Sequence, residues 1–419
     1  MIVLYNFFTS VAPAFLKIIA PFSPKIRLWL SSVQNWKEEI NKSEIVSAEC
    51  NVWFHCASLG EFEQGKPVME ALKQHYPKVS IVVTFFSPSG YSARKNTPLA
   101  SFVGYLPIDT KENAMDFINI VKPQLAFFIK SEIWPNFINA LRAKHIPAFL
   151  LSARFHEKQT LFKRRGRFFR NQLRKFDLIF VQNKSSRTLL KKHNLDSVFS
   201  GDTRYDQVSQ LPAQKKEFPF INKFKNNESL LISGSVWMED LEALSTFISG
   251  NETKIILAPH DVSDKMVLRI ISFLKVPAIR YSLINEQTDL ANSKVLIIDS
   301  IGMLASLYAL ADVAYVGGAF KQGLHNILEP AVYGIPVIFG PETTGFPEAA
   351  EILKEGGGFS IKDKNELNEL LCLLFNDSTR RLESGKKNSD FIQTRKGATE
   401  KIMTSVKTTV SNLSCFSGN

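Results

Sequence analysis

Short apolar runs alternate with helix-like stretches along most of this chain. The runs are rich in β-branched and aromatic residues and lack the strict apolar–polar alternation of a half-exposed strand, which is typical of strands buried on both faces. Such β–α alternation predicts parallel sheets covered by helices on both sides. The predicted strands lie at 52–55, 80–85, 125–129, 148–151, 178–181, 230–232, 254–257, 295–298, 313–316 and 336–339.

The residues that follow the predicted strands of the second half are small or polar. Ser233-Gly234-Ser235, Ala258-Pro259-His260 and Asp299-Ser300 each follow a strand directly, and Gly317-Gly318 follow another. The carboxyl ends of parallel strands meet at one edge of a sheet, where open α/β sheets bind ligands. We therefore predict an α/β fold of two doubly wound, Rossmann-like halves with a ligand cleft between them.

The length of 419 residues exceeds what one ordinary core holds, and 45% hydrophobic with 22% charged residues is typical of a globular protein. The alternation of strand-like and helix-like stretches stops at 206–228. This polar stretch contains Pro212 and Pro219, which predicts a linker. We expect an N-terminal segment at 1–30, a first domain at 31–205 and a second at 229–419. The last helix is a candidate to pack back on the first domain.

The first 30 residues are apolar and aromatic, but Asn6, Pro13, Lys17 and Pro21 interrupt them. A clean spanning helix needs about 20 apolar residues, and a signal peptide needs a charged start and a cleavage site. An interfacial, membrane-associated helix fits better. A short single span and a buried helix of the first domain stay open as alternatives, and we place the body of the protein in the cytoplasm.

Positive charge exceeds negative charge by 11, with 51 Lys and Arg against 40 Asp and Glu. The excess is concentrated at 154–192, which suits anionic lipid or a phosphorylated substrate, although a solvated helix face is an equal alternative. No segment resembles a nucleic-acid-reading module, so we predict no nucleic-acid partner. The four cysteines lack metal-ligand spacing and are expected to be reduced thiols, and no metal or cofactor is predicted.

The segment 312–346 is the strongest candidate for a nucleotide site. A strand ends in Gly317-Gly318, and a predicted helix opens at His325, where unpaired N–H groups can bind an anion. Glu329 at that helix start could accept two ribose hydroxyls. The alternative is a capping box formed by Asn326 and Glu329. That alternative does not explain glycines at 317, 318, 323, 334, 340 and 345, so a ligand site is favoured.

Three charged residues at other strand ends are candidates for chemistry. Glu61 lies at the start of a predicted helix, where the helix dipole favours an ionised carboxylate that can act as general base, or that simply stabilises the helix. Glu132 lies among aromatic neighbours after a strand, as an enclosed carboxylate or as a surface acid. Arg204 precedes the predicted linker and could offset charge on a phosphate leaving group.

Together these segments resemble the Kdo transferases of lipopolysaccharide synthesis, which add 3-deoxy-D-manno-octulosonic acid (Kdo) to lipid A precursors. The resemblance covers nearly the whole chain and rests on 58–61, 131–136, 201–206, Ala258-Pro259 and 312–341. It implies a two-domain GT-B fold and metal-independent, inverting transfer from CMP-Kdo to a lipid A precursor (lipid IVA). It also implies an N-terminus held on the cytoplasmic face of the bacterial inner membrane with anionic lipids.

By position, the resemblance assigns Glu61 as the catalytic base, with Glu132 and Arg204 stabilising the transition state. Arg204 stands where many members have Lys. The CMP contacts it implies are Pro259, His260, Ile301, Gly302, Met303, Asn326, Ile327, Leu328 and Glu329.

This chain departs from the family pattern at three positions. His260 stands where many relatives carry Arg, Met303 stands where many carry Glu, and Leu324 replaces a Gly before His325. Two other functions stay open: a GT-B enzyme that uses another nucleotide sugar such as a UDP-hexose, and a non-catalytic membrane-bound adaptor.

Overall fold

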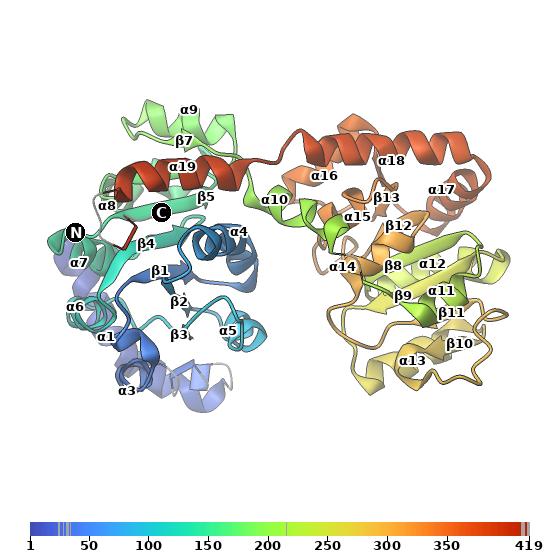
Figure 1. Ribbon diagram of the computed structural model, residues 1–419, viewed down its shortest axis with the longest axis horizontal. Helices are drawn as coiled ribbons and strands as arrows, with labels where there is room; N and C mark the ends of the chain where they lie inside the picture. The colour runs from blue at the N-terminus through green and yellow to red at the C-terminus, as the bar shows by residue number, and fades with distance from the viewer. Residues whose placement is uncertain are drawn as a thin grey trace. The chain divides into compact units, whose positions relative to one another are not determined.

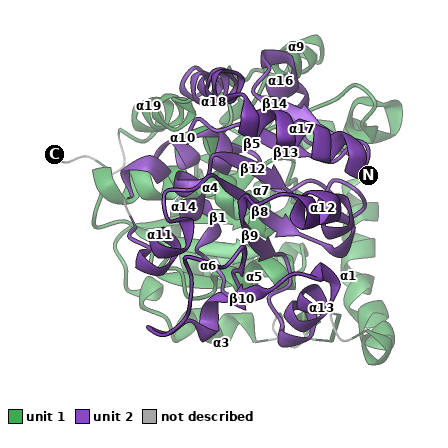
Figure 2. Cartoon of the chain, turned by 90° about the vertical axis from the view of Figure 1, so that its right-hand side faces the viewer, with its two compact units in different colours: residues 1–206, 396–419 green, residues 207–395 purple. Residues whose placement is uncertain are grey.

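Two compact units, each built on a parallel seven-stranded sheet, make up the chain in the computed structural model (Figure 1). The structure describes residues 1–23, 26–27, 29–30, 33, 35–214, 216–411 and 415–416. Unit 1 comprises Met1–Asp206 and Lys396–Asn419, and unit 2 comprises Gln207–Arg395 (Figure 2).

The sheet of unit 1 has the strand order β3-β2-β1-β4-β5-β6-β7. The order reverses between β1 and β4, which defines the topological switch point. Its strands are β1 (Asn51–Cys56), β2 (Ser80–Phe85), β3 (Phe102–Tyr105), β4 (Pro123–Ile129), β5 (Ala148–Ala153), β6 (Leu178–Val181) and β7 (Val198–Phe199). Its helices are α1 (Ile2–Ile19), α3 (Trp36–Asn41), α4 (Leu59–His75), α5 (Pro88–Arg94), α6 (Lys111–Val121), α7 (Pro135–Ala143), α8 (Arg167–Leu173), α9 (Lys184–Lys192), α10 (Thr203–Ser209), which runs into unit 2, and α19 (Ala398–Val410).

Each face of this sheet is covered by its own hydrophobic core. One core joins Trp53 and Phe128 of the sheet to Phe117 of α6 and Phe137 of α7. The other lies under α4 and α19 and includes Phe54. The whole of β1 is buried, which explains the apolar run at 52–54 in its sequence.

The sheet of unit 2 has the order β10-β11-β9-β8-β12-β13-β14, and its order reverses between β8 and β12. The strands are β8 (Leu230–Val236), β9 (Lys254–Pro259), β10 (Ala278–Arg280), β11 (Val295–Ile297), β12 (Val313–Val316), β13 (Val337–Phe339) and β14 (Gly358–Ser360). The helices are α11 (Pro219–Lys225), α12 (Met238–Gly250), α13 (Asp264–Leu274), α14 (Leu304–Leu307), α15 (Leu328–Ala331), α16 (Pro347–Glu355), α17 (Lys364–Asn376) and α18 (Ser378–Gln393).

The predicted α/β architecture is confirmed, and every predicted strand coincides with a strand of one of the two sheets. The sequence does not predict β3, β7, β10 and β14, which are the outermost strands of their sheets. Outer strands are short and partly exposed, so they lack the long apolar run that identifies the inner ones.

The boundary between the units differs from the one expected. Part of the segment 206–228, expected as a linker, forms α11, and its Ile221 and Phe224 are fully buried in the core of unit 2. The last helix, α19, belongs to unit 1, where it packs against α4. Asp206 holds the start of α19 in place by accepting hydrogen bonds from the backbone N–H groups of Gly397 and Thr399.

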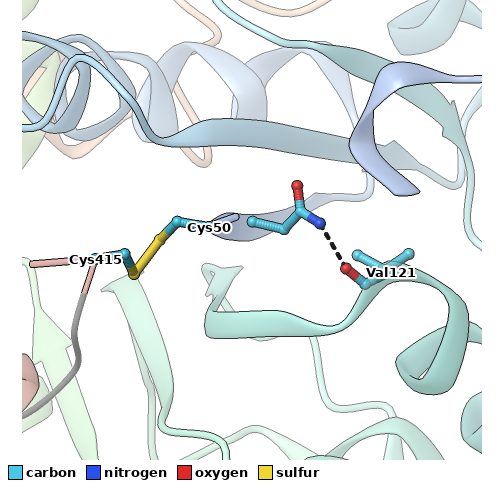
Figure 3. Close-up of a disulfide and its surroundings, with 4 residues drawn as sticks. Cys50, Val121 and Cys415 are labelled. Atoms are coloured by element: carbon cyan, nitrogen blue, oxygen red, sulfur yellow. Dashed lines mark hydrogen bonds between the residues drawn. A yellow bond between two sulfur atoms is a disulfide. The ribbon is translucent and has the colours of Figure 1, made fainter. Parts of the chain in front are cut away.

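A disulfide links the start of the unit 1 sheet to the residues after the last helix. Cys50, just before β1, is bonded to Cys415, which follows α19 (Figure 3). The expectation of reduced thiols is therefore wrong for this pair, because the return of α19 brings together residues that are 365 positions apart. Cys56 and Cys372 are free cysteines. Next to the disulfide, Asn51 donates a 2.7 Å hydrogen bond to the carbonyl oxygen of Val121 (Figure 3).

Helix α1 lies against unit 1 along one side only. The hydroxyl of Tyr5 donates a 2.6 Å hydrogen bond to Asp109, and its ring contacts Phe168. No residue of the helix is buried, so the alternative of a buried helix is wrong. Residues Ile2–Phe22 are long and apolar enough to cross a membrane, with a mean hydropathy of 1.6. The helix therefore presents an apolar outer face while it stays attached to the body of unit 1.

Candidate active site

The switch point of unit 1 brings two of the predicted catalytic residues together. Glu61 lies in the first turn of α4, directly after β1, and Glu132 lies in the turn after β4. Strands β1 and β4 are neighbours in the sheet, so both carboxylates are placed at its carboxyl edge. Ligands of doubly wound sheets bind at this point.

The carboxyl group of Glu61 is almost completely buried, with 7% of the residue exposed. Burial, together with the negative charge of Glu132, raises its pKa to about 7, while Lys130 and hydrogen bonds from backbone N–H groups oppose the rise. One of these, from Ala57 to Oε2, is 2.6 Å long. Desolvation therefore opposes the ionised form that the helix start was expected to favour, and Glu61 keeps its proton to a higher pH than an exposed carboxyl group does. A carboxylate with a pKa near neutrality is well matched to general-base catalysis.

Glu132 faces a cavity of about 590 Å³ inside unit 1. Its Oε2 accepts a 2.8 Å hydrogen bond from the indole N–H of Trp134 and lies 3.7 Å from Nε2 of His55. The cavity is also lined by Tyr5 of α1 and by Arg165. A carboxylate at the wall of a partly apolar cavity with a nearby guanidinium suits a ligand that is both apolar and anionic.

Arg204 lies in the first turn of α10 and forms a two-pronged ion pair with Asp202. Its Nε and Nη2 are 3.0 and 2.8 Å from Asp202 Oδ2. The neighbouring Thr203 donates a hydrogen bond to the carbonyl oxygen of Gln64, which lies on α4. The segment that carries Arg204 is thereby fixed to the helix that carries Glu61.

The switch point of unit 2 gathers three rings from three different segments. Trp237 follows β8, His260 follows β9, and His325 follows β12 by a short loop. The ring of His260 stacks on that of Trp237 at 4.5 Å and on that of His325 at 4.7 Å between centroids. Trp237 Nε1 donates to Nε2 of His325 at 3.3 Å. Burial, assisted by His260, lowers the pKa of His325 to about 4, so His325 is neutral at physiological pH.

Asp240, which the sequence analysis missed, organises the glycine loop beside these rings. Its carboxylate accepts hydrogen bonds from the backbone N–H of Trp237 at 2.8 Å, from the hydroxyl of Tyr315 at 2.8 Å and from the N–H of Gly318 at 3.0 Å. Gly318 has a φ of +93°, and a Cβ there would lie 2.9 Å from the ring of His325. The only sequence signal for Asp240 is its position three residues after Trp237, where an acid caps a helix start.

The predicted helix at His325 begins only at Leu328 and contains four residues, Leu328–Ala331. A helix this short provides a weaker dipole for an anion than the sequence suggested. Asn326 accepts a hydrogen bond from the N–H of Leu328 at 3.1 Å and donates one to Glu329 Oε1 at 3.0 Å. Asn326 and Glu329 therefore stabilise their own turn in part. Neither side chain is buried. Ile327 and Leu328 are buried and can offer only backbone groups.

The remaining candidates for CMP contacts lie at the ends of two adjacent strands. Pro259 is the last residue of β9, and the loop after β11, which pairs with β9, carries Ile301, Gly302 and Met303. Gly302 has a φ of +91°, and Ile301 is 88% exposed. Among the residues that the structure describes, no group of three or more His, Cys, Asp and Glu could hold a metal ion.

Comparisons with solved structures show the fold. The chain is similar to UDP-GlcNAc 2-epimerase from Neisseria meningitidis, with 13% identity, a TM-score of 0.59 and coverage of 85% of this chain and 99% of the other. It is also similar to MurG from Acinetobacter baumannii, with 14% identity, a TM-score of 0.51 and coverage of 86% and 99%. Both likenesses fit the GT-B arrangement of two Rossmann-like units.

Comparisons of sequence identify the family. Residues 34–207 match the family described as 3-deoxy-D-manno-octulosonic-acid transferase (kdotransferase). The chain is 30% identical over 354 residues to the 3-deoxy-D-manno-octulosonic acid transferase of Rickettsia bellii, covering 81% of this chain and 82% of that protein. It is 28% identical to the enzyme of the same name from Haemophilus influenzae, covering 85% and 86%. This chain therefore belongs to the 3-deoxy-D-manno-octulosonic acid transferase family.

Proposed function

We propose that this protein is a glycosyltransferase that moves Kdo from CMP-Kdo to a lipid A precursor, lipid IVA, in lipopolysaccharide core biosynthesis. We further propose that the transfer inverts the anomeric centre and needs no metal. Membership of the family supports the reaction class. The observation that carries the proposal is Glu61, a buried carboxyl group with a pKa of about 7 next to Glu132 at the sheet switch point of unit 1.

In the proposed reaction Glu61 removes the proton of an acceptor sugar hydroxyl. The hydroxyl oxygen forms a bond to the anomeric carbon of Kdo from the face opposite the phosphate, and the bond from that carbon to the phosphate oxygen breaks. A sugar hydroxyl is a very weak acid, so the proton leaves as the new bond forms. CMP departs with the electron pair, and Arg204 with backbone N–H groups offsets its charge.

The donor nucleotide is assigned to unit 2. The Gly318 loop, held by Asp240, and the stacked rings of Trp237, His260 and His325 provide a rigid polar edge for a phosphate. Glu329 is proposed to accept hydrogen bonds from the ribose hydroxyls.

Replacing Glu329 with Ala is expected to weaken CMP binding by about tenfold or more, because a hydrogen bond to a charged group contributes roughly 1.5–3 kcal/mol. Titration calorimetry with CMP measures the change. The exposed Glu369→Ala on α17 is the matched control and should bind CMP as the wild type does. Unchanged affinity in Glu329→Ala would show that the Asn326–Glu329 pair only stabilises its own turn.

The acceptor and the membrane are assigned to unit 1. The outer face of α1 exposes a row of large apolar side chains: Val3, Leu4, Phe7, Phe8, Val11, Phe15 and Ile18. The inner side contributes Tyr5 to the cavity that Glu132 and Arg165 also line. A helix of this kind lies in the plane of a membrane surface. We propose that α1 rests on the cytoplasmic face of the inner membrane, so that a lipid with a phosphorylated head group meets the cavity from there.

The double variant Phe8→Ser with Phe15→Ser is expected to lose binding to vesicles that contain phosphatidylglycerol. Each phenyl ring removed from the membrane costs about 2 kcal/mol, so the partition coefficient should fall by at least a hundredfold. Cosedimentation with vesicles measures it. The control is Leu268→Ser with Leu382→Ser, two similarly exposed apolar residues of unit 2. Equal loss in both double variants would contradict a specific role for α1.

The decisive test of the function is incubation with CMP-Kdo and a tetra-acylated lipid A precursor, with the products analysed by mass. A product heavier by one or more Kdo units, formed equally in EDTA, would support the proposal. Transfer from a UDP-hexose instead would identify the alternative GT-B activity. A protein that transfers from neither donor would be the non-catalytic adaptor.

A further inference from the structure

His55 is a fully buried histidine at the carboxyl end of β1, and the proposed mechanism does not use it. It directly precedes Cys56 in the chain, and its Nε2 lies 3.7 Å from Oε2 of Glu132, one of the two switch-point carboxylates. The edge of its ring meets Trp134 at 5.2 Å between centroids. A buried imidazole costs free energy unless both of its nitrogens have hydrogen-bond partners. The groups around Nδ1 and Nε2 therefore indicate what His55 does.

The hydrogen-bond partner of Nδ1 of His55 is the hydroxyl group of Thr84 on β2. The Thr84 hydroxyl oxygen accepts a 2.8 Å hydrogen bond from the indole N–H of Trp53 and lies 3.0 Å from Nδ1 of His55. Among the residues that the structure describes, this hydroxyl has no other side-chain partner. Since Trp53 can only donate, the hydroxyl hydrogen remains for Nδ1. Pairing this hydrogen makes Nδ1 the acceptor, which assigns a ring proton of His55 to Nε2.

The Nε2 side faces Glu132. Within the described part of the chain, Nε2 has no hydrogen-bond partner, and the acceptor it faces is Oε2 of Glu132 at 3.7 Å. That oxygen already accepts the N–H of Trp134 but has a second lone pair. A distance of this size is too long for a hydrogen bond, and catalytic hydrogen bonds often shorten only when substrate is bound. A small rotation of the Glu132 carboxyl group would satisfy Nε2.

We propose that His55 is a positioning residue for the transfer reaction, which donates its Nε2 proton to Glu132 when the substrates bind and so fixes the orientation of that carboxylate. The inference rests on the proposed function. The hydrogen bonds from Trp53 to Thr84 and between Thr84 and His55 select the tautomer of His55. No proton passes along them to the substrate. Glu61, Lys130 and Arg165 are the other charged groups near this carboxylate.

A matched pair of variants tests the proposal. The amide nitrogen of Gln can occupy the place of Nε2, and the amide of Asn can occupy that of Nδ1. His55→Gln therefore keeps the donor to Glu132, whereas His55→Asn keeps only the contact to Thr84. We expect kcat to fall about tenfold or less in His55→Gln and about a hundredfold in His55→Asn, since loss of such supporting partners costs roughly 10–100-fold. KM for CMP-Kdo should stay constant in both.

The order of the two variants is decisive. If His55 were only a structural residue, Asn would be the better replacement, because it keeps the buried hydrogen bond to Thr84. Turnover in His55→Asn equal to or above that of His55→Gln would overturn the role of His55. Thermal unfolding of both variants shows whether each is folded. A wild-type protein that transfers no Kdo would instead overturn the proposed function and this role with it.

A second measurement does not depend on activity or on a variant of His55. Nitrogen-15 NMR of the full-length, histidine-labelled protein distinguishes the two neutral tautomers, because a protonated ring nitrogen and a bare one resonate in separate regions. Thr84→Val assigns the signal, since it perturbs the histidine that contacts this hydroxyl. A proton on Nε2 in the wild type is expected. A proton on Nδ1 would leave no hydrogen for Glu132 and would overturn the inference.

Discussion

Replacing Glu61 with Gln is expected to abolish Kdo transfer and, at the same time, to stabilise the folded protein above neutral pH. Turnover should fall by about 10²–10⁴-fold, because general-base catalysis contributes that much and Gln cannot take a proton. CMP binding should be unchanged, since the candidate contacts to the nucleotide all belong to unit 2. Near-normal turnover would contradict the assignment of Glu61 as the base.

The stability effect follows from the raised pKa of Glu61. The folded state holds this proton up to about pH 7, against an ordinary value of 4.5. The stabilising contribution of the protonated group is therefore complete below about pH 4.5 and is lost as the pH rises through 7. Ionisation of the buried group then costs up to roughly 3 kcal/mol, a cost that Gln avoids.

Thermal unfolding should accordingly show a higher Tm for Glu61→Gln than for the wild type at pH 8 and little difference at pH 4. In the wild type, kcat/KM should decline below pH 7 as Glu61 becomes protonated. Glu70→Gln, on the same helix but paired with Lys66, is the control and should change neither quantity. A variant that is less stable than the wild type at pH 8 would argue against a desolvated carboxyl group at position 61.

The inner strands of both sheets could be predicted because burial on two faces favours runs of consecutive apolar side chains. In β1 and β9 every residue is buried, and the sequence shows this as the apolar runs 52–54 and 255–259. The outer strands face the core only in part, and β7 has just two residues, so no such run exists. The disulfide could not be predicted. The sequence of α19 shows an apolar face, but it does not show that this face packs against α4 and so brings Cys415 to Cys50.

The candidate site could be predicted as far as strand ends determine it. Neighbouring strands of a parallel sheet bring Glu61 and Glu132 to one edge, whatever their separation in sequence. The protonation of Glu61 could not be predicted, because it depends on how completely the surrounding side chains exclude water. Asp240 and His55 were missed because each has an ordinary structural explanation in the sequence. Asp240 reads as a helix cap and His55 as part of an apolar strand, and only their buried partners distinguish them from such residues.

Replacing Asp240 with Ala is expected to disable the donor site and destabilise unit 2. Three donors converge on this buried carboxylate, from Trp237, Tyr315 and Gly318. Alanine leaves the fully buried Tyr315 hydroxyl and the Gly318 N–H without their acceptor, and each loss costs about 1–3 kcal/mol. The free energy of unfolding should fall by roughly 3–5 kcal/mol, since removing one member of a buried charged network has that effect.

Glu239 is the matched control for Asp240, because it is the preceding residue but pairs at the surface with the exposed Lys321. Glu239→Ala should cost less than about 1 kcal/mol, as exposed ion pairs do. Urea unfolding measures both variants, and calorimetry with CMP measures the donor site. Because Gly318 has a φ of +93° and closes against His325, release of its N–H should displace the loop and weaken CMP binding at least tenfold. If Asp240→Ala were destabilised but bound CMP normally, the carboxylate would support the core of unit 2 and not the nucleotide site.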